Sequence, residues 1–180
     1  MAIASSSELI RRFDAAEEHW CVAFNRWSDR NAIRHFFAAI SWLGDGKFWY
    51  VLILGLPFLF GSHALTRSIQ FTVTGVVGVL LYKFLKRSFV RERPYISHLR
   101  IRVGARPLDR YSFPSGHTLH AVSFAILFSC CFPVLLWIVV PFAVLVALSR
   151  VVLGLHYPTD VAVGALLGTA LALTSLSIFG

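Results

Sequence analysis

Charge is scarce in this chain. Only 14% of its 180 residues are Asp, Glu, Lys or Arg, whereas 57% belong to the apolar set of Ala, Val, Ile, Leu, Met, Phe, Trp, Tyr and Cys. A water-soluble domain of this size needs more polar surface than this composition supplies. The composition therefore excludes an ordinary soluble domain and indicates a chain that lies in a membrane.

Cysteine and acidic residues are scarce as well. The three cysteines, two of them adjacent at Cys130 and Cys131, have the spacing of neither a disulfide framework nor a zinc site. The 17 Lys and Arg outnumber the 9 Asp and Glu, which gives a net charge of +8. Because no soluble surface is left to carry a nucleic-acid-binding patch, we expect the partner of this charge to be anionic lipid or phosphate.

The start of the chain lacks the basic stretch and apolar core of a signal peptide, so we expect it to stay on the protein. Ser5 and Glu8 have the spacing of a capping box. Apolar residues then recur at helical spacing at Leu9, Phe13, Trp20, Phe24 and Trp27. The opposite face carries Arg11, Arg12, Asp14, Glu17 and Glu18. The pattern predicts an amphipathic helix within residues 1–30 that lies in the membrane interface.

Apolar runs dominate the rest of the chain. Five stretches cover Phe48–Phe60, Ile69–Tyr82, Thr118–Phe132, Val134–Leu148 and Val161–Phe179. Most are shorter than the roughly 20 residues that cross a bilayer, so flanking residues must complete them. A further helix is expected from Ala32 to Leu43, before the turn-forming Gly44-Asp45-Gly46. The sequence predicts an all-α, polytopic membrane bundle of five transmembrane helices, or six if the helix from Ala32 to Leu43 inserts.

With five spans, the N-terminal helix, the loop 87–116 and the segment 150–160 share one face of the membrane. Arg67 is then the only Lys or Arg in the opposite connections. The positive-inside rule places the basic face in the cytoplasm, unless some of these charges serve chemistry rather than topology.

Three polar clusters fall on the basic face. The first runs from Lys86, at the end of a span, to Arg93-Pro94 seven residues later. Taken singly, such basic residues anchor a span or snorkel to the interface. The second is Pro114-Ser115-Gly116-His117, directly before an apolar helix. Its free amides and the helix dipole form either an anion site beside His117 or an ordinary helix start.

The third cluster joins the fourth and fifth spans and contains Arg150, His156 and Asp160. Asp160 can accept a hydrogen bond from one imidazole nitrogen of His156, which leaves the other nitrogen basic. A structural His–Asp pair is the alternative, but ionisable residues at a membrane boundary are costly and tend to mark function. Thr159 is placed to cap the last helix.

Together the clusters resemble the type 2 phosphatidic acid phosphatase family, whose pattern is Lys-x6-Arg-Pro, then Pro-Ser-Gly-His, then Ser-Arg-x5-His-x3-Asp. The sequence matches all three motifs in order between Lys86 and Asp160. The resemblance implies one membrane-embedded phosphatase domain over residues 1–180, with its catalytic region at 86–160. The soluble relatives with this pattern, acid phosphatases and vanadium haloperoxidases, are excluded by the apolar spans.

The resemblance also implies a role for each motif residue. His156 is the nucleophile that forms a phosphohistidine, Asp160 holds its tautomer, and His117 protonates the leaving oxygen and then activates water. The groups that hold the phosphoryl oxygens are Lys86, Arg93, Ser115, the Gly116 amide and Arg150. Because no Asp, Glu or His cluster offers a metal site and no cofactor is implied, we expect a metal-independent mechanism.

Other basic residues fall outside this pattern. Those of the loop, Arg100, Arg102 and Arg106, either face anionic lipid or a substrate headgroup, or serve topology alone. His120 either lines the pocket or packs. No role follows for Arg87, Arg91, His98 and Arg110, and the histidines expected at the surface or interface are His19, His35 and His63.

Because the clusters lie at a membrane face, the expected substrate is a lipid phosphate whose tail enters between the spans. Members of the family act on phosphatidate, phosphatidylglycerophosphate, lipid A phosphates and polyprenyl diphosphates. In the inner membrane of a bacterium, a cytoplasmic site favours phosphatidylglycerophosphate and a periplasmic site favours undecaprenyl diphosphate. The alternative function is lipid-phosphate binding or transport without turnover, although binding alone would need no nucleophile.

Overall fold

The computed structural model describes residues 16–89, 91–107 and 109–179. These ranges are mostly helical and form no β-strand, apart from one isolated bridge between Glu92 and Tyr111. Helix α2 is Asn31–Trp42, α3 is Phe48–Phe60, α4 is Leu65–Ser88, α5 is Pro94–Ser97, α6 is Gly116–Cys131, α7 is Leu136–Val152 and α8 is Pro158–Phe179. The prediction of an all-α chain is confirmed over these residues.

Four helical stretches of the described chain are long and apolar enough to cross a membrane. They are Asn31–Phe60, Ser62–Ser88, Pro133–Val152 and Pro158–Phe179, and Gly116–Cys131 is a shorter apolar helix. These five helical stretches contain the apolar stretches predicted from the sequence, apart from Phe132. The number that spans a bilayer stays a prediction.

The helix expected from Ala32 to Leu43 does not end at the glycines but continues into α3. The two helices are joined by a π-helical turn, η2 (Leu43–Lys47), within which Asp45 and Gly46 leave helical geometry. Gly46 has φ +103°, a conformation that costs glycine little and other residues much. The predicted turn is therefore a kink in one helical run, and it turns Asp45 into a cavity at this end of the bundle.

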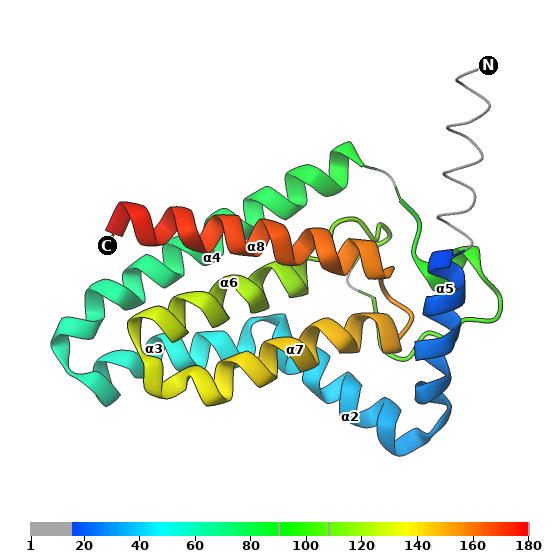
Figure 1. Ribbon diagram of the computed structural model, residues 1–180, viewed down its shortest axis with the longest axis horizontal. Helices are drawn as coiled ribbons and strands as arrows, with labels where there is room; N and C mark the ends of the chain where they lie inside the picture. Colours follow the sequence, from blue (N-terminus) through cyan, green and yellow to red (C-terminus); the bar gives the residue numbers. More distant parts are fainter. Residues whose placement is uncertain (1–15, 90, 108, 180) are drawn as a thin grey trace.

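Helix α6 lies at the centre of the bundle, against both α7 and α8 (Figure 1). Gly164, Gly168 and Ala172 recur every four residues on the face of α8 that is buried. A Cβ atom at Gly168 would lie 2.4 Å from the carbonyl oxygen of Leu119, and one at Gly164 would lie 2.6 Å from that of Ser115. Small residues thus let the two backbones touch, as is common between membrane helices.

Aromatic side chains fill the space between α3, α4, α6 and α7. The ring centroids of Trp49 and Phe124 are 5.4 Å apart, and those of Phe71 and Phe128 are 4.9 Å apart. In contrast, Phe58 is 91% exposed and Trp137 is 80% exposed on the outer surface of the bundle. Apolar side chains on both the inside and the outside are what a helix bundle in lipid requires.

The N-terminal helix, the long loop and the connection between α7 and α8 meet at one end of the bundle, at the right of Figure 1. The Asn25 side chain joins them, because its Nδ2 donates to the carbonyl oxygens of Arg102 and Val152, both at 2.9 Å. At the opposite end, Arg67 donates to the carbonyl oxygen of Phe179 at 3.1 Å. The predicted gathering of the basic segments at one end is confirmed.

The N-terminal helix is described from residue 16 onward, and its first part, including the predicted capping box, lies outside the described residues. Within residues 16–25 the buried side chains are Glu17, Cys21 and Asn25, whereas Trp20 is exposed. The assignment of Glu17 to an outer charged face is therefore wrong. All three cysteines are free, in agreement with the sequence.

We expect Gly168→Ala to destabilise the protein, because the added methyl group would lie 2.4 Å from the Leu119 carbonyl oxygen and force α6 and α8 apart. The loss in the free energy of unfolding should be about 1–3 kcal/mol, as for other overpacked sites. Thermal unfolding of the detergent-solubilised protein measures this loss.

The matched control is Gly55→Ala in α3, where the nearest atom, Leu59 Cδ1, lies 3.9 Å from the new Cβ. Alanine favours the helix there, so this variant should be unchanged or slightly stabilised. Equal unfolding temperatures for the two variants would contradict the close packing of α6 on α8.

Candidate active site

Five segments of the chain bring the three sequence clusters together at the end of the bundle where the N-terminal helix and the long loop meet, which we call the loop-bearing end. Lys86 lies in the last turn of α4, Arg93 directly precedes α5, His117 begins α6 and Arg150 lies in the last turn of α7. His156 follows in the connection to α8. All five side chains line one cavity of about 570 Å³. The structure therefore brings together residues that are up to 70 positions apart in the sequence.

His156 is almost completely buried. Its Nε2 lies 3.4 Å from Nη1 of Arg93, and its Nδ1 lies 3.6 Å from Oδ2 of Asp160. The distance to Asp160 is thus too long for the expected hydrogen bond, and Nδ1 has no hydrogen-bond partner among the described residues. Burial, together with the charges of Arg150, Arg93 and Lys86, holds the pKa of His156 well below its ordinary value of 6.5. The imidazole is therefore neutral at neutral pH.

Asp160 is fully buried in the first turn of α8. Its Oδ2 accepts a hydrogen bond from the Tyr157 amide at 2.9 Å, and its Oδ1 accepts one from Arg91 Nη1 at 2.8 Å. The prediction that Thr159 caps this helix is wrong. The Thr159 amide and hydroxyl instead donate to Oε1 of Glu17, at 2.9 and 2.6 Å.

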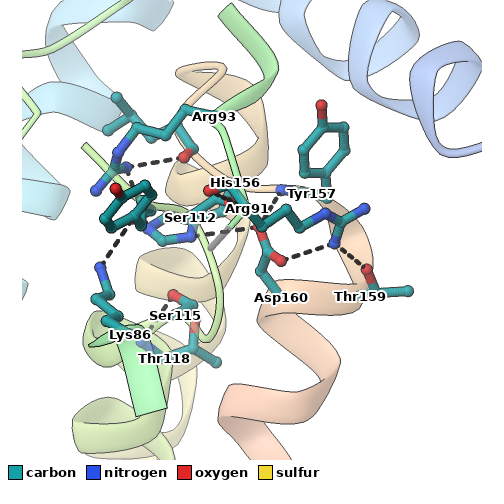
Figure 2. A network of polar contacts seen from close by, with 12 residues as sticks. Lys86, Arg91, Arg93, Ser112, Ser115, Thr118, His156, Tyr157, Thr159 and Asp160 are labelled. Atoms are coloured by element: carbon teal, nitrogen blue, oxygen red, sulfur yellow. Dashed lines mark hydrogen bonds and ion pairs between the residues drawn. The ribbon is translucent and has the colours of Figure 1, made fainter. Parts of the chain in front are cut away.

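Arg91 contacts Asp160 and Thr159 (Figure 2) and also pairs with Glu17 of the N-terminal helix. Its guanidinium pairs with both Asp160 and Glu17 and lies 3.9 Å from the centre of the Tyr157 ring. Burial alone would lower the pKa of Arg91, but the two carboxylates raise it above its ordinary value. This pair could not be predicted from the sequence, because no local spacing shows that Arg91 and Glu17, 74 positions apart, lie together.

Lys86 and Arg93 share a carboxylate that the sequence analysis also missed. Asp109 accepts hydrogen bonds from Lys86 Nζ at 2.9 and 2.7 Å and from Arg93 Nη2 at 2.6 Å. Burial would raise the pKa of Asp109, but these two cations outweigh it and hold the pKa below the ordinary value of 3.8. Asp109 is therefore ionised. It lies in an irregular loop without any pattern that could have singled it out.

Arg150 is almost completely buried and lines the cavity. Its Nη1 donates to the hydroxyl of Ser41 in α2, whereas its Nε has no hydrogen-bond partner among the described residues. Leaving a buried cationic donor without a partner is costly. An anion in the cavity would satisfy it.

The start of α6 provides two of the expected groups. Gly116 and His117 line the cavity, and Nε2 of His117 lies 3.6 Å from Oδ1 of Asp45 at the kink between α2 and α3. Ser115 lies behind them as the N-cap, where its hydroxyl contacts Thr118 Oγ1 at 2.9 Å and accepts from the Thr118 amide at 3.4 Å. Direct contact of the Ser115 hydroxyl with phosphate stays a prediction.

Both interpretations of His120 hold. It lines the cavity, and its Nδ1 and Nε2 lie 3.0 and 3.1 Å from the carbonyl oxygens of Gly116 and Gly75, so it also connects α6 to α4. His98 lies 3.3 Å from Glu18. Among the basic residues outside the motifs, those with exposed side chains include Arg100, Arg102, Arg106, His19, His35 and His63.

No group of three or more His, Cys, Asp or Glu that could hold a metal ion occurs in the part of the chain that the structure describes.

The cavity continues from the polar groups along α3 and α4. Its lining there consists mainly of apolar side chains, among them Trp49, Ile53, Val76 and Val79. A polar end that contains Lys86, Arg93 and Arg150, with an apolar extension, suits an amphiphilic ligand with an anionic head.

Several known phosphatases are similar in sequence to this chain. The chain is 30% identical over 113 residues to the undecaprenyl-diphosphatase BcrC of Bacillus subtilis, covering 62% of this chain and 58% of that protein. It is 37% identical over 138 residues to the decaprenylphosphoryl-5-phosphoribose phosphatase of Mycobacterium tuberculosis, covering 73% and 72%. An undecaprenyl-diphosphatase of Sulfolobus acidocaldarius is 34% identical over 117 residues, covering 63% and 56%. The matches to the two undecaprenyl-diphosphatases thus span somewhat more than half of their length.

Two crystal structures share the fold. LpxE of Aquifex aeolicus has a TM-score of 0.73 at 27% identity, covering 86% of this chain and 93% of that one. A transmembrane phosphatidylglycerolphosphate phosphatase of Bacillus subtilis has a TM-score of 0.73 at 26% identity, covering 93% and 86%. The sequence profile of the PAP2 superfamily matches residues 68–180, well over half of the chain. The protein therefore belongs to the PAP2 superfamily, as its motifs indicated.

Proposed function

We propose that this protein is a membrane lipid phosphatase or diphosphatase that works through a phosphohistidine intermediate and needs no metal ion. The main support for the proposal is the arrangement around His156. A neutral, buried imidazole presents Nε2 beside the cation Arg93, in a cavity that also contains Lys86 and Arg150 and has an apolar extension.

In the first step, Nε2 of His156 attacks the phosphorus atom and the bond from phosphorus to the lipid oxygen breaks. The imidazole becomes positively charged as the new N–P bond forms. Asp160, held by Arg91 and the Tyr157 amide, lies 3.6 Å from Nδ1 and stabilises this charge. Because Asp160 is fixed before the reaction, little reorganisation is needed.

His117 donates the proton that the leaving oxygen takes up. Asp45 Oδ1 lies 3.6 Å from its Nε2 and can pair with the ring while the ring carries this proton. In the second step the neutral His117 removes a proton from water, and the resulting hydroxide attacks phosphorus. The N–P bond breaks, inorganic phosphate forms and His156 returns to its neutral state.

The three cations and the Gly116 amide at the start of α6 hold the phosphoryl oxygens. Arg150 supports this role most directly, because its buried Nε lacks a partner in the described chain. Fixed positive charges at these oxygens supply the stabilisation that metal ions supply in other phosphoryl transfers.

The apolar extension of the cavity supports a lipid substrate with its phosphate at the loop-bearing end. The relatives reported above include undecaprenyl-diphosphatases, and a structural neighbour is a phosphatidylglycerolphosphate phosphatase. We therefore propose undecaprenyl diphosphate first and phosphatidylglycerophosphate second, in a bacterial inner membrane. Both present a terminal phosphate on a long apolar tail.

His156→Ala should abolish phosphate release, because the nucleophile is lost. We expect the rate to fall by about 10³-fold or more with the purified protein in detergent, while EDTA leaves the wild-type rate unchanged. Inorganic phosphate released from undecaprenyl diphosphate, phosphatidylglycerophosphate and phosphatidate gives the rates. The control is His35→Ala at an exposed position of α2, which should retain the wild-type rate.

This experiment also separates turnover from binding. A protein that only binds or transports lipid phosphate would release none as wild type and would keep its lipid in the variant. Release that persists in His156→Ala, or wild-type release that EDTA removes, would contradict the proposed mechanism.

His117→Ala should slow the reaction according to the leaving group. With an alkyl lipid phosphate the rate should fall by about 10²–10⁴-fold, because the alkoxide leaves without a proton. With p-nitrophenyl phosphate, whose phenolate leaves unaided, the first step should stay close to the wild-type rate. Stopped-flow measurement of the nitrophenolate burst tests this, and an equal loss with both substrates would exclude His117 as the general acid.

A further inference from the structure

Asp109 is bound to two of the cations that the proposed function assigns to the phosphoryl group. Both of its carboxylate oxygens accept hydrogen bonds from Lys86, and Oδ1 also accepts one from Arg93. The donor–acceptor distances lie between 2.6 and 2.9 Å, the range of strong charge-assisted hydrogen bonds. A carboxylate in this position binds the cations as two phosphate oxygens would.

The contacts of Lys86 put Asp109 in competition with any other anion at this position. An ammonium group has three donors. Nζ contacts both carboxylate oxygens of Asp109 and also the carbonyl oxygen of Tyr111, the last at 3.1 Å. A phosphate that approaches Lys86 therefore competes with the Asp109 carboxylate for its donors and its charge.

The surroundings allow the carboxylate to move while the loop stays in place. The Asp109 side chain is 39% exposed, whereas that of Lys86 is 11% exposed and that of Arg93 is 1% exposed. The loop backbone has its own anchors, because Arg93 Nε donates to the Asp109 carbonyl oxygen and the Ser112 amide donates to the carbonyl oxygen of Arg91, both at 2.8 Å. Rotation of the side chain toward solvent breaks neither bond.

We propose that Asp109 is a tethered competitor of phosphate that sets how tightly this site holds its substrate phosphate and its inorganic product. This inference rests on the proposed function. The Asp109 carboxylate gives up Lys86 and Arg93 when a phosphoryl group enters and takes them back as inorganic phosphate leaves. Asp109 is a determinant of phosphate affinity and release, and it takes no part in the bond-making steps.

The benefit of such a competitor follows from the charge of the site. Three cations and a helix N-terminus around one phosphate would hold the product tightly and slow its release. A carboxylate attached to the same loop has a high effective concentration at Lys86 and Arg93. It therefore weakens the binding of every phosphate that uses these cations.

Asp109→Asn tests the inference, because it keeps the shape of the side chain and removes its charge. We expect the dissociation constant of inorganic phosphate, measured by calorimetry on the detergent-purified protein, to fall about ten-fold or more. The inhibition constant of inorganic phosphate in lipid phosphate hydrolysis should fall in parallel. Both KM and kcat should decrease, since the substrate binds more tightly and the product leaves more slowly.

Glu92→Gln is the matched control. Glu92 is another carboxylate beside this loop, and its ion-pair partner is the exposed Arg110 at 3.4 Å. Its neutralisation changes the net charge by the same amount without freeing Lys86 or Arg93. The affinity for inorganic phosphate and the kinetic constants should stay at their wild-type values.

Unchanged or weaker phosphate binding by Asp109→Asn, with an active wild type, would overturn this inference and leave the proposed function standing. A wild type that neither hydrolyses a lipid phosphate nor binds inorganic phosphate would overturn both. Asp109→Ser is the second variant, with the same expected tightening. If both variants lose their thermal unfolding transition, Asp109 is a structural residue and the inference fails.

Discussion

The contact between α6 and α8 determines where His117, His156 and Asp160 lie. Gly164 and Gly168 let the backbone of α8 reach that of α6, and the Ser115 amide donates to the carbonyl oxygen of Asp160 at 3.0 Å. This contact holds the first turn of each helix against the other. His117 lies on α6, His156 lies just before α8 and Asp160 lies on α8, so the three residues keep a fixed spacing. A loose helix pair could not hold the two histidines at this spacing.

Charge compensation is the second requirement of the site. Several cations gathered at the end of an apolar bundle repel one another, and a carboxylate beside a cation offsets this repulsion. Glu17 and Asp160 provide this for Arg91, and Asp109 provides it for Lys86 and Arg93. Arg150 has no ion pair of this kind among the described residues, which makes it the cation with most to gain from a bound phosphate.

The sequence predicted the parts of this structure that depend on local patterns. Apolar runs predicted where the helices lie, because lipid-facing and core-facing residues are both apolar. Three motifs predicted His117, His156 and Asp160 as candidate site residues, because proteins of one family share the spacing of these motifs. The pairs of Arg91 with Glu17 and of Lys86 with Asp109 join distant segments without any periodic pattern, so they became visible only in three dimensions. Glu17 was predicted on the outer charged face of its helix for the same reason, although it is buried. A helix period shows which residues share a face but not what covers that face.

The proposed mechanism depends on His156 carrying the phosphoryl group between the two chemical steps. This can be tested by quenching the His117→Ala protein during turnover of p-nitrophenyl phosphate and locating the modification by mass spectrometry under alkaline conditions. Because this variant lacks the base for the second step, we expect one phosphoryl group to accumulate on His156. A phosphoryl group on another residue, or continued turnover with none on the protein, would exclude His156 as the carrier.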